Sequence, residues 1–285
     1  MKCGKCNYWL IAPLVLLVAA CGGKAKKQAD GMTQEKETTV RESSTMETIQ
    51  VGSVNVTWIQ DNAGDRPMAR SLFPDAGDAL IDSLSLRDGV PSTVSVFVVK
   101  TDSVVILFDT GLGAADSRLQ AGLKSLGMEP SDVRYLYLTH MHGDHIGGML
   151  TAEGEVVFPN AEVYVSKPEH DYWMTASSNP RAAKTLEAYR NKLHLFAFGD
   201  TLPGGVAAME AVGHTPGHTV FQVGRLLVVG DLFHGLALQL AHPEICATYD
   251  MDKEKAVETR KRFIRYAQEN ELTMAGMHLP APAFH

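Results

Sequence analysis

The pattern of hydrophobic positions changes twice along the chain. An apolar stretch, Trp9 to Ala20, is followed by a polar and charged segment that lasts until about Thr48. From Ile49 onward, runs of alternating apolar residues indicate β-strands, and runs with helical spacing follow between them. The pattern predicts a leader over residues 1–20, a flexible tether over 21–48 and one folded region over 49–285.

Within the folded region we expect strands in pairs, interrupted by helices. The strands expected at 94–99 and 104–108 are joined by the polar run Lys100-Thr101-Asp102-Ser103, which predicts a hairpin. A strand-like region opens at residue 49, and the other expected strands are 133–138, 156–158, 163–165, 206–212, 219–223, 226–229 and 272–277. The expected helices are 118–126, 168–175, 181–194 and 252–270. This order is typical of an α/β or α+β domain with helices outside two sheets.

Length and charge narrow the class of protein. A chain of 285 residues that is 45% hydrophobic can bury the core of one large domain. Its formal net charge of −7 argues against nucleic acid as a partner, because phosphate binding needs a basic surface. The expected partner is a small-molecule substrate, and the sequence does not set the oligomeric state.

The N-terminal residues are typical of an export signal. Lys2 and Lys5 make a basic region, and the apolar stretch behind them is too short to span a bilayer comfortably. The signal ends in Val18-Ala19-Ala20-Cys21-Gly22, which resembles a bacterial lipobox with cleavage before Cys21 and lipid on its thiol. This predicts an exported membrane lipoprotein that faces the periplasm or the cell exterior. An ordinary signal peptide is the alternative.

Four side chains that can bind a metal lie within six residues, in the run His140-Met141-His142-Gly143-Asp144-His145. Two histidines that are two apart at a strand end can face one ion, and imidazole with carboxylate suits Zn²⁺, Mn²⁺ or Fe²⁺. Three more residues with side chains that can bind a metal lie at or beside the ends of expected strands: His218, Asp231 and His278. Residues spread over loops in this way are typical of a catalytic site.

Together these motifs resemble the metallo-β-lactamase superfamily. The resemblance runs from about Phe97 to Leu279. Beside the ligand run it rests on Phe108-Asp109-Thr110-Gly111, Leu138-Thr139-His140, Thr215-Pro216-Gly217-His218 and Gly230-Asp231. It implies an α+β fold, a four-layer αββα sandwich, with a dinuclear metal site at one edge.

The resemblance also implies which residues hold each of two divalent ions, with Zn²⁺ foremost and Mn²⁺ or Fe²⁺ as alternatives. The first ion would be held by His140, His142 and His218, the second by Asp144, His145 and His278, and both by a bridging Asp231. In the best-known zinc β-lactamases a Cys stands at position 231, and in the diiron oxidoreductases a carboxylate stands at position 142. Asp231 and His142 therefore argue against antibiotic hydrolysis and against redox chemistry.

A narrower resemblance is to the methyl parathion hydrolase and quorum-quenching lactonase branch. It rests on Phe158-Pro159-Asn160-Ala161-Glu162, on Gly230-Asp231-Leu232-Phe233-His234 with Gln239 and Pro243, and on Met277-His278-Leu279-Pro280. It implies a zinc-dependent hydrolase whose hydroxide, shared by both ions, attacks a lactone or related ester. Asp144 would be catalytic, taking a proton from the nucleophile and passing it to the leaving group.

Three alternatives stay open. Phosphotriester hydrolysis of the methyl parathion hydrolase type would use the same nucleophile, and thioester hydrolysis shares the Thr-Pro-Gly-His motif. A lipid-anchored binding module, stabilised by its metal, is the alternative that is not an enzyme. The complete ligand set favours an enzyme, because a structural metal site needs only four closed ligands.

Several residues near the expected ligands have secondary assignments. We expect Asp109 to orient a ligand histidine. Thr139 and Thr215 either bond the backbone of the metal loops or serve local turns. His214 and His234 either face the substrate or are structural, and the structural role is favoured.

Overall fold

The computed structural model describes residues 45–285 except 65 and 177–178. Its contacts divide the chain into two units, Met1–Glu42 and Ser43–His285. The expected signal, the lipidation of Cys21 and most of the tether lie outside the described residues and stay predictions. The first strand begins at Met46, slightly before the expected boundary at 49. Over residues 45–285, apart from the gaps just named, no helix has the length and apolar character needed to cross a membrane.

Two sheets form the middle of the folded unit. The larger has the order β1-β2-β3-β4-β5-β6-β7, and its strands are antiparallel from β1 to β4 and parallel from β4 to β7. They span Met46–Val51, Val54–Gln60, Ser95–Lys100, Val105–Phe108, Val133–Tyr137, Glu162–Ser166 and Leu193–Phe196. The smaller has the order β12-β11-β10-β9-β8, with only β11 and β12 parallel. From β8 to β12 these strands span Thr201–Leu202, Val206–Glu210, Thr219–Val223, Leu226–Gly230 and Thr273–Gly276.

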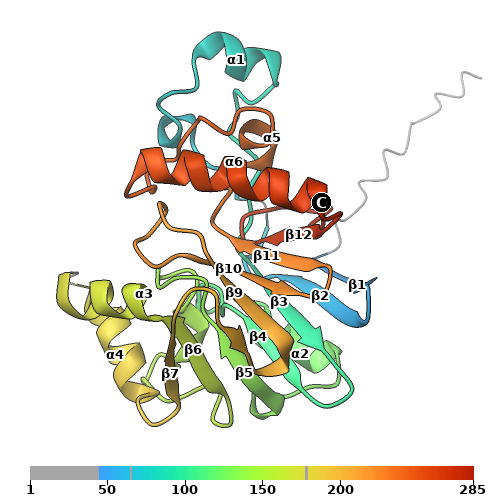
Figure 1. The fold of residues 1–285 in the computed structure, drawn as a ribbon, viewed down its shortest axis with the longest axis vertical. Helices are drawn as coiled ribbons and strands as arrows, with labels where there is room; N and C mark the ends of the chain where they lie inside the picture. The colour runs from blue at the N-terminus through green and yellow to red at the C-terminus, as the bar shows by residue number, and fades with distance from the viewer. Residues whose placement is uncertain (1–44, 65, 177–178) are drawn as a thin grey trace, which may run out of the picture. The chain divides into compact units, whose positions relative to one another are not determined.

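Helices cover the outer faces of both sheets. The α-helices α1 to α6 span Asp78–Ser83, Leu119–Ser125, Lys167–Asp171, Pro180–Ala188, Leu236–Gln239 and Lys253–Glu269, and α3 continues into a π-helical turn at Tyr172–Ala176. Short 3-10 turns occur at Arg70–Leu72, Pro130–Asp132, Gly147–Met149 and Pro203–Gly205. Figure 1 shows α6 lying across the smaller sheet, with α3 and α4 beside β6 and β7.

Alternating side chains divide the core into layers. In β3, Val98 packs with α2 and α4 while its neighbour Phe97 points between the sheets. In β11, Val228 points between the sheets while Leu227 packs against Phe263 of α6. Successive strand residues face opposite sides, so each sheet is apolar on both faces and needs a cover on each. The result is the αββα sandwich that the resemblance implied.

Two of the expected elements differ from the structure, one in its end and one in its existence. The helix expected at 181–194 ends at Ala188, and His194 belongs to strand β7. This edge strand leaves His194 and Leu195 exposed, so its sequence lacks the alternation that identifies a half-buried strand. The strand expected at 156–158 is absent from the described fold, where Val156 forms only an isolated bridge to Leu150. The helix expected at 252–270 is confirmed as α6, and the Asp252 carboxylate caps it by accepting from the Lys255 amide at 3.1 Å.

Candidate metal centre

Strand ends from both sheets bring the ligand-type residues together at one edge of the sandwich. The run from His140 follows β5, and Asp109 follows the parallel strand β4 beside it. Asp231 follows β11, and His278 follows the parallel strand β12. Carboxyl ends of parallel neighbouring strands meet at the same edge, so residues far apart in sequence become neighbours there.

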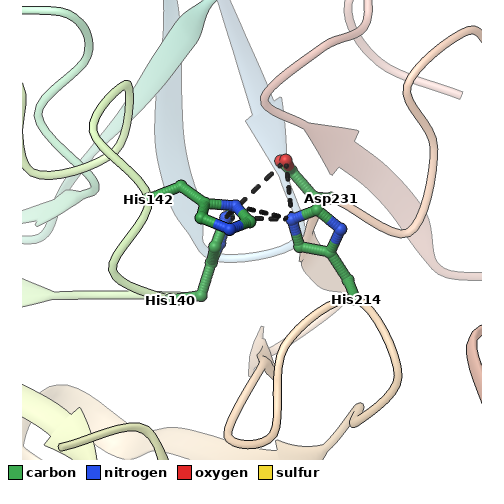
Figure 2. Close-up of side chains that lie close together, drawn as sticks. All are labelled: His140, His142, His214 and Asp231. Atoms are coloured by element: carbon green, nitrogen blue, oxygen red, sulfur yellow. Dashed lines mark hydrogen bonds and ion pairs between the residues drawn. The ribbon is translucent and has the colours of Figure 1, made fainter. Parts of the chain in front are cut away.

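One cluster consists of three imidazoles and a carboxylate (Figure 2). Nε2 of His140 lies 2.9 Å from Nδ1 of His142 and 3.2 Å from Nε2 of His214. Oδ2 of Asp231 lies 3.3 Å from Nε2 of His214 and 3.7 Å from Nε2 of His140. Three ring nitrogens that converge with a carboxylate offer the donor set that Zn²⁺ prefers. We call this set the His140 cluster.

A second cluster, Asp144, His145 and His278, lies beside the first, and we call it the His145 cluster. Nε2 of His145 lies 3.9 Å from an Asp144 oxygen, and Nε2 of His278 lies 3.7 Å from the other oxygen. Asp231 reaches this cluster as well, with Oδ1 at 3.2 Å from His145 Nε2 and Oδ2 at 3.1 Å from His278 Nε2. One carboxylate therefore faces both clusters, which is the arrangement expected of a bridging ligand.

The structure revises the expectation for His218. Its Nδ1 bonds the carbonyl oxygen of Ala211 at 3.0 Å, and its Nε2 accepts the backbone amide of Asp231 at 3.0 Å. Both ring nitrogens thus have backbone partners, and His214 takes the place in the His140 cluster that we had assigned to His218. The motif Gly213-His214-Thr215-Pro216-Gly217-His218 contains both histidines, and the geometry favours a ligand role for His214 over the structural role that we expected.

The rings of His145, His214 and His278 each have an outer partner that fixes their orientation. Asp109 bonds His145 Nδ1 at 2.8 Å and also accepts from the amide and hydroxyl of Thr139, as expected for an orienting carboxylate. The Asp250 carboxylate lies 3.1 Å from His214 Nδ1, and the Thr93 carbonyl lies 2.6 Å from His278 Nδ1. Such partners hold the tautomer and direction of a metal-binding imidazole.

Burial and mutual charge keep His140, His142 and Asp231 in the forms that bind metals. Burial lowers the pKa of His142 to about 3 and holds the pKa of His140 well below its ordinary range, so both are neutral near pH 7. Burial alone would raise the pKa of Asp231, but His145, His278 and His140 outweigh it and hold that pKa well below its ordinary value. Metal ligands must be neutral imidazoles and ionised carboxylates, so these shifts favour a bound cation.

Unpartnered atoms show that the residues fit a cation. His145 Nε2 and Asp231 Oδ1 are buried, and neither has a hydrogen-bond partner. Buried polar atoms are rarely left without a partner, because the lost hydration costs about 1–3 kcal/mol for each group. A divalent ion between the two atoms would satisfy both.

The clusters open onto a cavity of about 470 Å³. His142, Asp144, His214, Asp231 and His278 form its polar end. Met68, Leu72, Val94, Tyr249 and Arg66 also line the cavity. A cavity of this size with a few convergent polar groups suits a small-molecule substrate.

His234 also lines this cavity, and neither of its ring nitrogens has a hydrogen-bond partner, although the side chain is buried. Its ring is stacked on that of His278, with 5.5 Å between centroids, and its Nε2 lies 3.5 Å from Asp231 Oδ2. A purely structural histidine would bond its surroundings. The substrate-facing assignment therefore fits His234 better than the structural one.

Sequence reasoning missed three buried charged residues around the site. Asp250 is hydrogen-bonded to His214 and to the buried Arg260. Glu169 accepts hydrogen bonds from the amides of Met141 and Gly217, which lie in the two loops that carry His140 and His214. Asp61 accepts from the amides of Leu112, Arg118 and Leu119 and fixes the loop after β4. None belongs to a local motif, because each acts on segments far away in sequence.

The sandwich and its His and Asp clusters together define a metal-dependent hydrolase fold. A family model described as "Metallo-beta-lactamase superfamily" matches residues 89–278, and the chain belongs to this superfamily.

Curated relatives match about half of the chain. Metallo-beta-lactamase domain-containing protein 1 of Xenopus laevis is 30% identical over 148 residues, which cover 49% of this chain and 54% of the relative. The N-acyl homoserine lactonase AttM of Azorhizobium caulinodans is 29% identical over 138 residues, which cover 42% of this chain and 49% of AttM. The uncharacterized protein YobT of Bacillus subtilis is 27% identical over 151 residues, which cover 49% of this chain and 62% of YobT. The matched part thus spans roughly half to six-tenths of these relatives.

Two solved structures match more of the chain. AidC, described as a dizinc quorum-quenching lactonase in complex with a product, has a TM-score of 0.76 and 28% identity, and the match covers 84% of this chain and 92% of AidC. The hydrolase AbOPH, described as a member of the beta lactamase superfamily, has a TM-score of 0.75 and 29% identity. The match covers 86% of this chain and 93% of AbOPH.

Proposed function

We propose that this protein is a dinuclear metal-dependent hydrolase, with Zn²⁺ as its metal, that opens a lactone or a related ester. The observation that carries the proposal is the shared carboxylate, since Asp231 faces both donor clusters at the polar end of one cavity. The similarity to AidC, described as a dizinc quorum-quenching lactonase, supports both the ion count and the substrate class.

We assign His140, His142 and His214 to one ion, Asp144, His145 and His278 to the other, and Asp231 to both. When bound, two such ions supply an activated water and polarise the carbonyl that it attacks. His218 is left out of the ligand set and instead holds the Asp231 backbone.

The chain's own residues supply the rest of the chemistry. Asp144 is the partly exposed carboxylate at the polar end, with a side chain that is 30% exposed, so substrate can reach it. We assign it the proton transfer from the nucleophile to the leaving oxygen. His234 can bond an oxygen of the substrate, and the apolar wall around Met68, Leu72 and Val94 can receive an apolar substituent.

The test is an assay of the purified full-length protein, stripped of metal and reloaded with Zn²⁺ or Mn²⁺. Lactone, ester, phosphotriester and thioester substrates are offered under the same conditions, and metal content is measured in parallel. We expect the lactone to give the highest kcat/KM. A higher kcat/KM for the phosphotriester or the thioester would mean that this class of compound, and not the lactone, is the substrate. Full metal loading without turnover of any substrate would leave the metal-stabilised binding module as the better description.

A further inference from the structure

A buried carboxylate lies between the two loops that carry the His140 cluster. Glu169, in the short helix α3, has no exposed surface. It is not among the atoms that converge on a metal, and no step of the proposed hydrolysis uses it. An ionised group buried this fully needs several hydrogen-bond donors to offset its lost hydration.

Glu169 finds those donors in two separate places. Oε1 accepts from the amide of Met141 at 2.9 Å and from the indole Nε1 of Trp173 at 2.6 Å. Oε2 accepts from the hydroxyl of Thr215 at 2.7 Å and from the amide of Gly217 at 2.9 Å. Each oxygen therefore serves a different part of the chain.

The positions of these donors connect Glu169 to three ligands. Met141 is the residue between His140 and His142, while Thr215 directly follows His214. The backbone beside each ligand is thus held by one carboxylate. The approach is close, because a Cβ on Gly217 would collide with the backbone of Glu169.

Trp173 extends the contact to a ligand ring. Its indole lies edge-on to the His142 imidazole, with 5.5 Å between centroids and an interplanar angle of 82°. Since Glu169 bonds the indole nitrogen, it fixes the ring that packs against His142. His142 is the only member of the His140 cluster that is not fully buried. The contact with the Trp173 indole therefore helps to hold its ring in place.

We propose that Glu169 is a positioning residue that holds the His140–His142 loop and the His214 loop at the separation a metal ion requires. Outer partners of metal ligands commonly contribute ten- to a hundred-fold in metal affinity, roughly, by holding ligands in the binding geometry. The inference rests on the proposed metal centre and not on the identity of the substrate.

The two oxygens predict an asymmetry between variants. In Glu169→Gln, the amide oxygen can still serve Met141 and Trp173, and the new NH₂ group can donate to the Thr215 hydroxyl. The NH₂ group then faces the Gly217 amide, which loses its acceptor. Glu169→Ala removes the acceptor for all four donors and leaves a cavity.

The experiment measures Zn²⁺ affinity of the full-length protein by competition with a chromophoric chelator. We expect affinity to fall about ten-fold in Glu169→Gln and up to about a hundred-fold in Glu169→Ala. Tyr266→Phe is the matched control, since it removes a part-buried hydrogen bond between Tyr266 of α6 and Gln222 of β10. The Zn²⁺ affinity of this variant should equal that of the wild type.

Trp173 provides a second readout that a merely structural role would not move. Zn²⁺ binding at His142 should change the indole fluorescence, and Trp173→Phe should abolish the change. We expect Glu169→Ala to weaken this response at subsaturating Zn²⁺ while circular dichroism still shows a folded protein. A folded Glu169→Ala variant with wild-type affinity and response would overturn the positioning role. A wild-type protein that binds no Zn²⁺ would instead overturn the metal centre itself.

Discussion

The backbone amide of Asp231 donates a hydrogen bond to Nε2 of His218 at 3.0 Å. The other ring nitrogen bonds the Ala211 carbonyl oxygen, so Nδ1 carries the proton and Nε2 is the acceptor. Gly230 makes the contact possible, because a Cβ at that position would collide with the His218 ring and its φ is +54°. His218 therefore holds the backbone of Asp231, while His214 faces the Asp231 carboxylate within the His140 cluster.

Replacing each histidine of this motif should separate the two roles. We expect His214→Ala to lose the ion of the His140 cluster, because a donor atom is removed. We expect His218→Ala to bind both ions at saturating Zn²⁺, with affinity lower by roughly ten- to a hundred-fold, since only the support of Asp231 is lost. Metal content after dialysis, measured by mass spectrometry, distinguishes the variants.

Stability provides the control for this pair. His218→Ala leaves the amide of Asp231 without an acceptor in the core, which should lower the free energy of unfolding by about 1–3 kcal/mol in the absence of metal. If His218→Ala, rather than His214→Ala, lost the ion of the His140 cluster, then the assignment by geometry would be wrong and the original expectation for His218 right.

The sequence predicted the kinds of ligand better than their identities. His140, His142, Asp144 and His145 are close in sequence at a strand end, so their proximity follows from local geometry alone. The motif with His214 and His218 offers two imidazoles four residues apart, and only the path of the loop between β9 and β10 decides which one turns toward Asp231. That path depends on long-range contacts, which no local pattern records.

Asp144→Asn tests the proposed proton transfer. The amide keeps the size of the side chain and can still place an oxygen near His278, but it cannot take up a proton near neutral pH. We expect kcat to fall by about 10²- to 10⁴-fold while the ion of the His140 cluster is retained. Steady-state kinetics with a parallel metal assay are the measurement. Unchanged kcat would remove Asp144 from the chemistry and leave it only as a ligand.

His234→Phe tests the substrate contact. Phenylalanine keeps an aromatic ring to stack on His278 but has no nitrogen to bond a substrate oxygen. A lost hydrogen bond of this kind should lower kcat/KM by roughly ten- to a hundred-fold. Metal content should stay at the wild-type level, and His234→Gln, which restores a donor, should recover part of the loss. Equal kcat/KM in wild type and His234→Phe would return His234 to a structural role.

The fold was more predictable than the contacts that support the site. Strands such as β3 and β11 have apolar residues on both faces, and their runs stand out in the sequence. Asp61, Glu169 and Arg260 are buried charged residues whose partners lie on other elements. Sequence alone gives such residues the appearance of ordinary surface charges.

The buried histidines predict that the metal-free protein is sensitive to acid. Burial lowers the pKa of His142, His218 and His234 to about 3, whereas the ordinary histidine value is 6.5. Between those values the unfolded chain binds protons that the folded chain does not, so the free energy of unfolding falls as the pH falls. His145 and His278 oppose this trend in the upper part of that range. Burial lowers their pKa values, but the neighbouring carboxylates, Asp231 foremost, outweigh it and raise them. Their stabilising contribution therefore still grows while the unfolded histidines take up protons around pH 6.5, and it is nearly complete by about pH 5.5.

Thermal unfolding of the chelator-treated protein should therefore show a Tm that decreases as the pH is lowered from about 6 to about 5. Exposed carboxylates with ordinary pKa values titrate mainly below this window. His234→Phe removes one of the neutral histidines and should make the decrease shallower. A Tm that stays flat or rises over this window would mean that burial does not keep His142, His218 and His234 neutral in the folded protein.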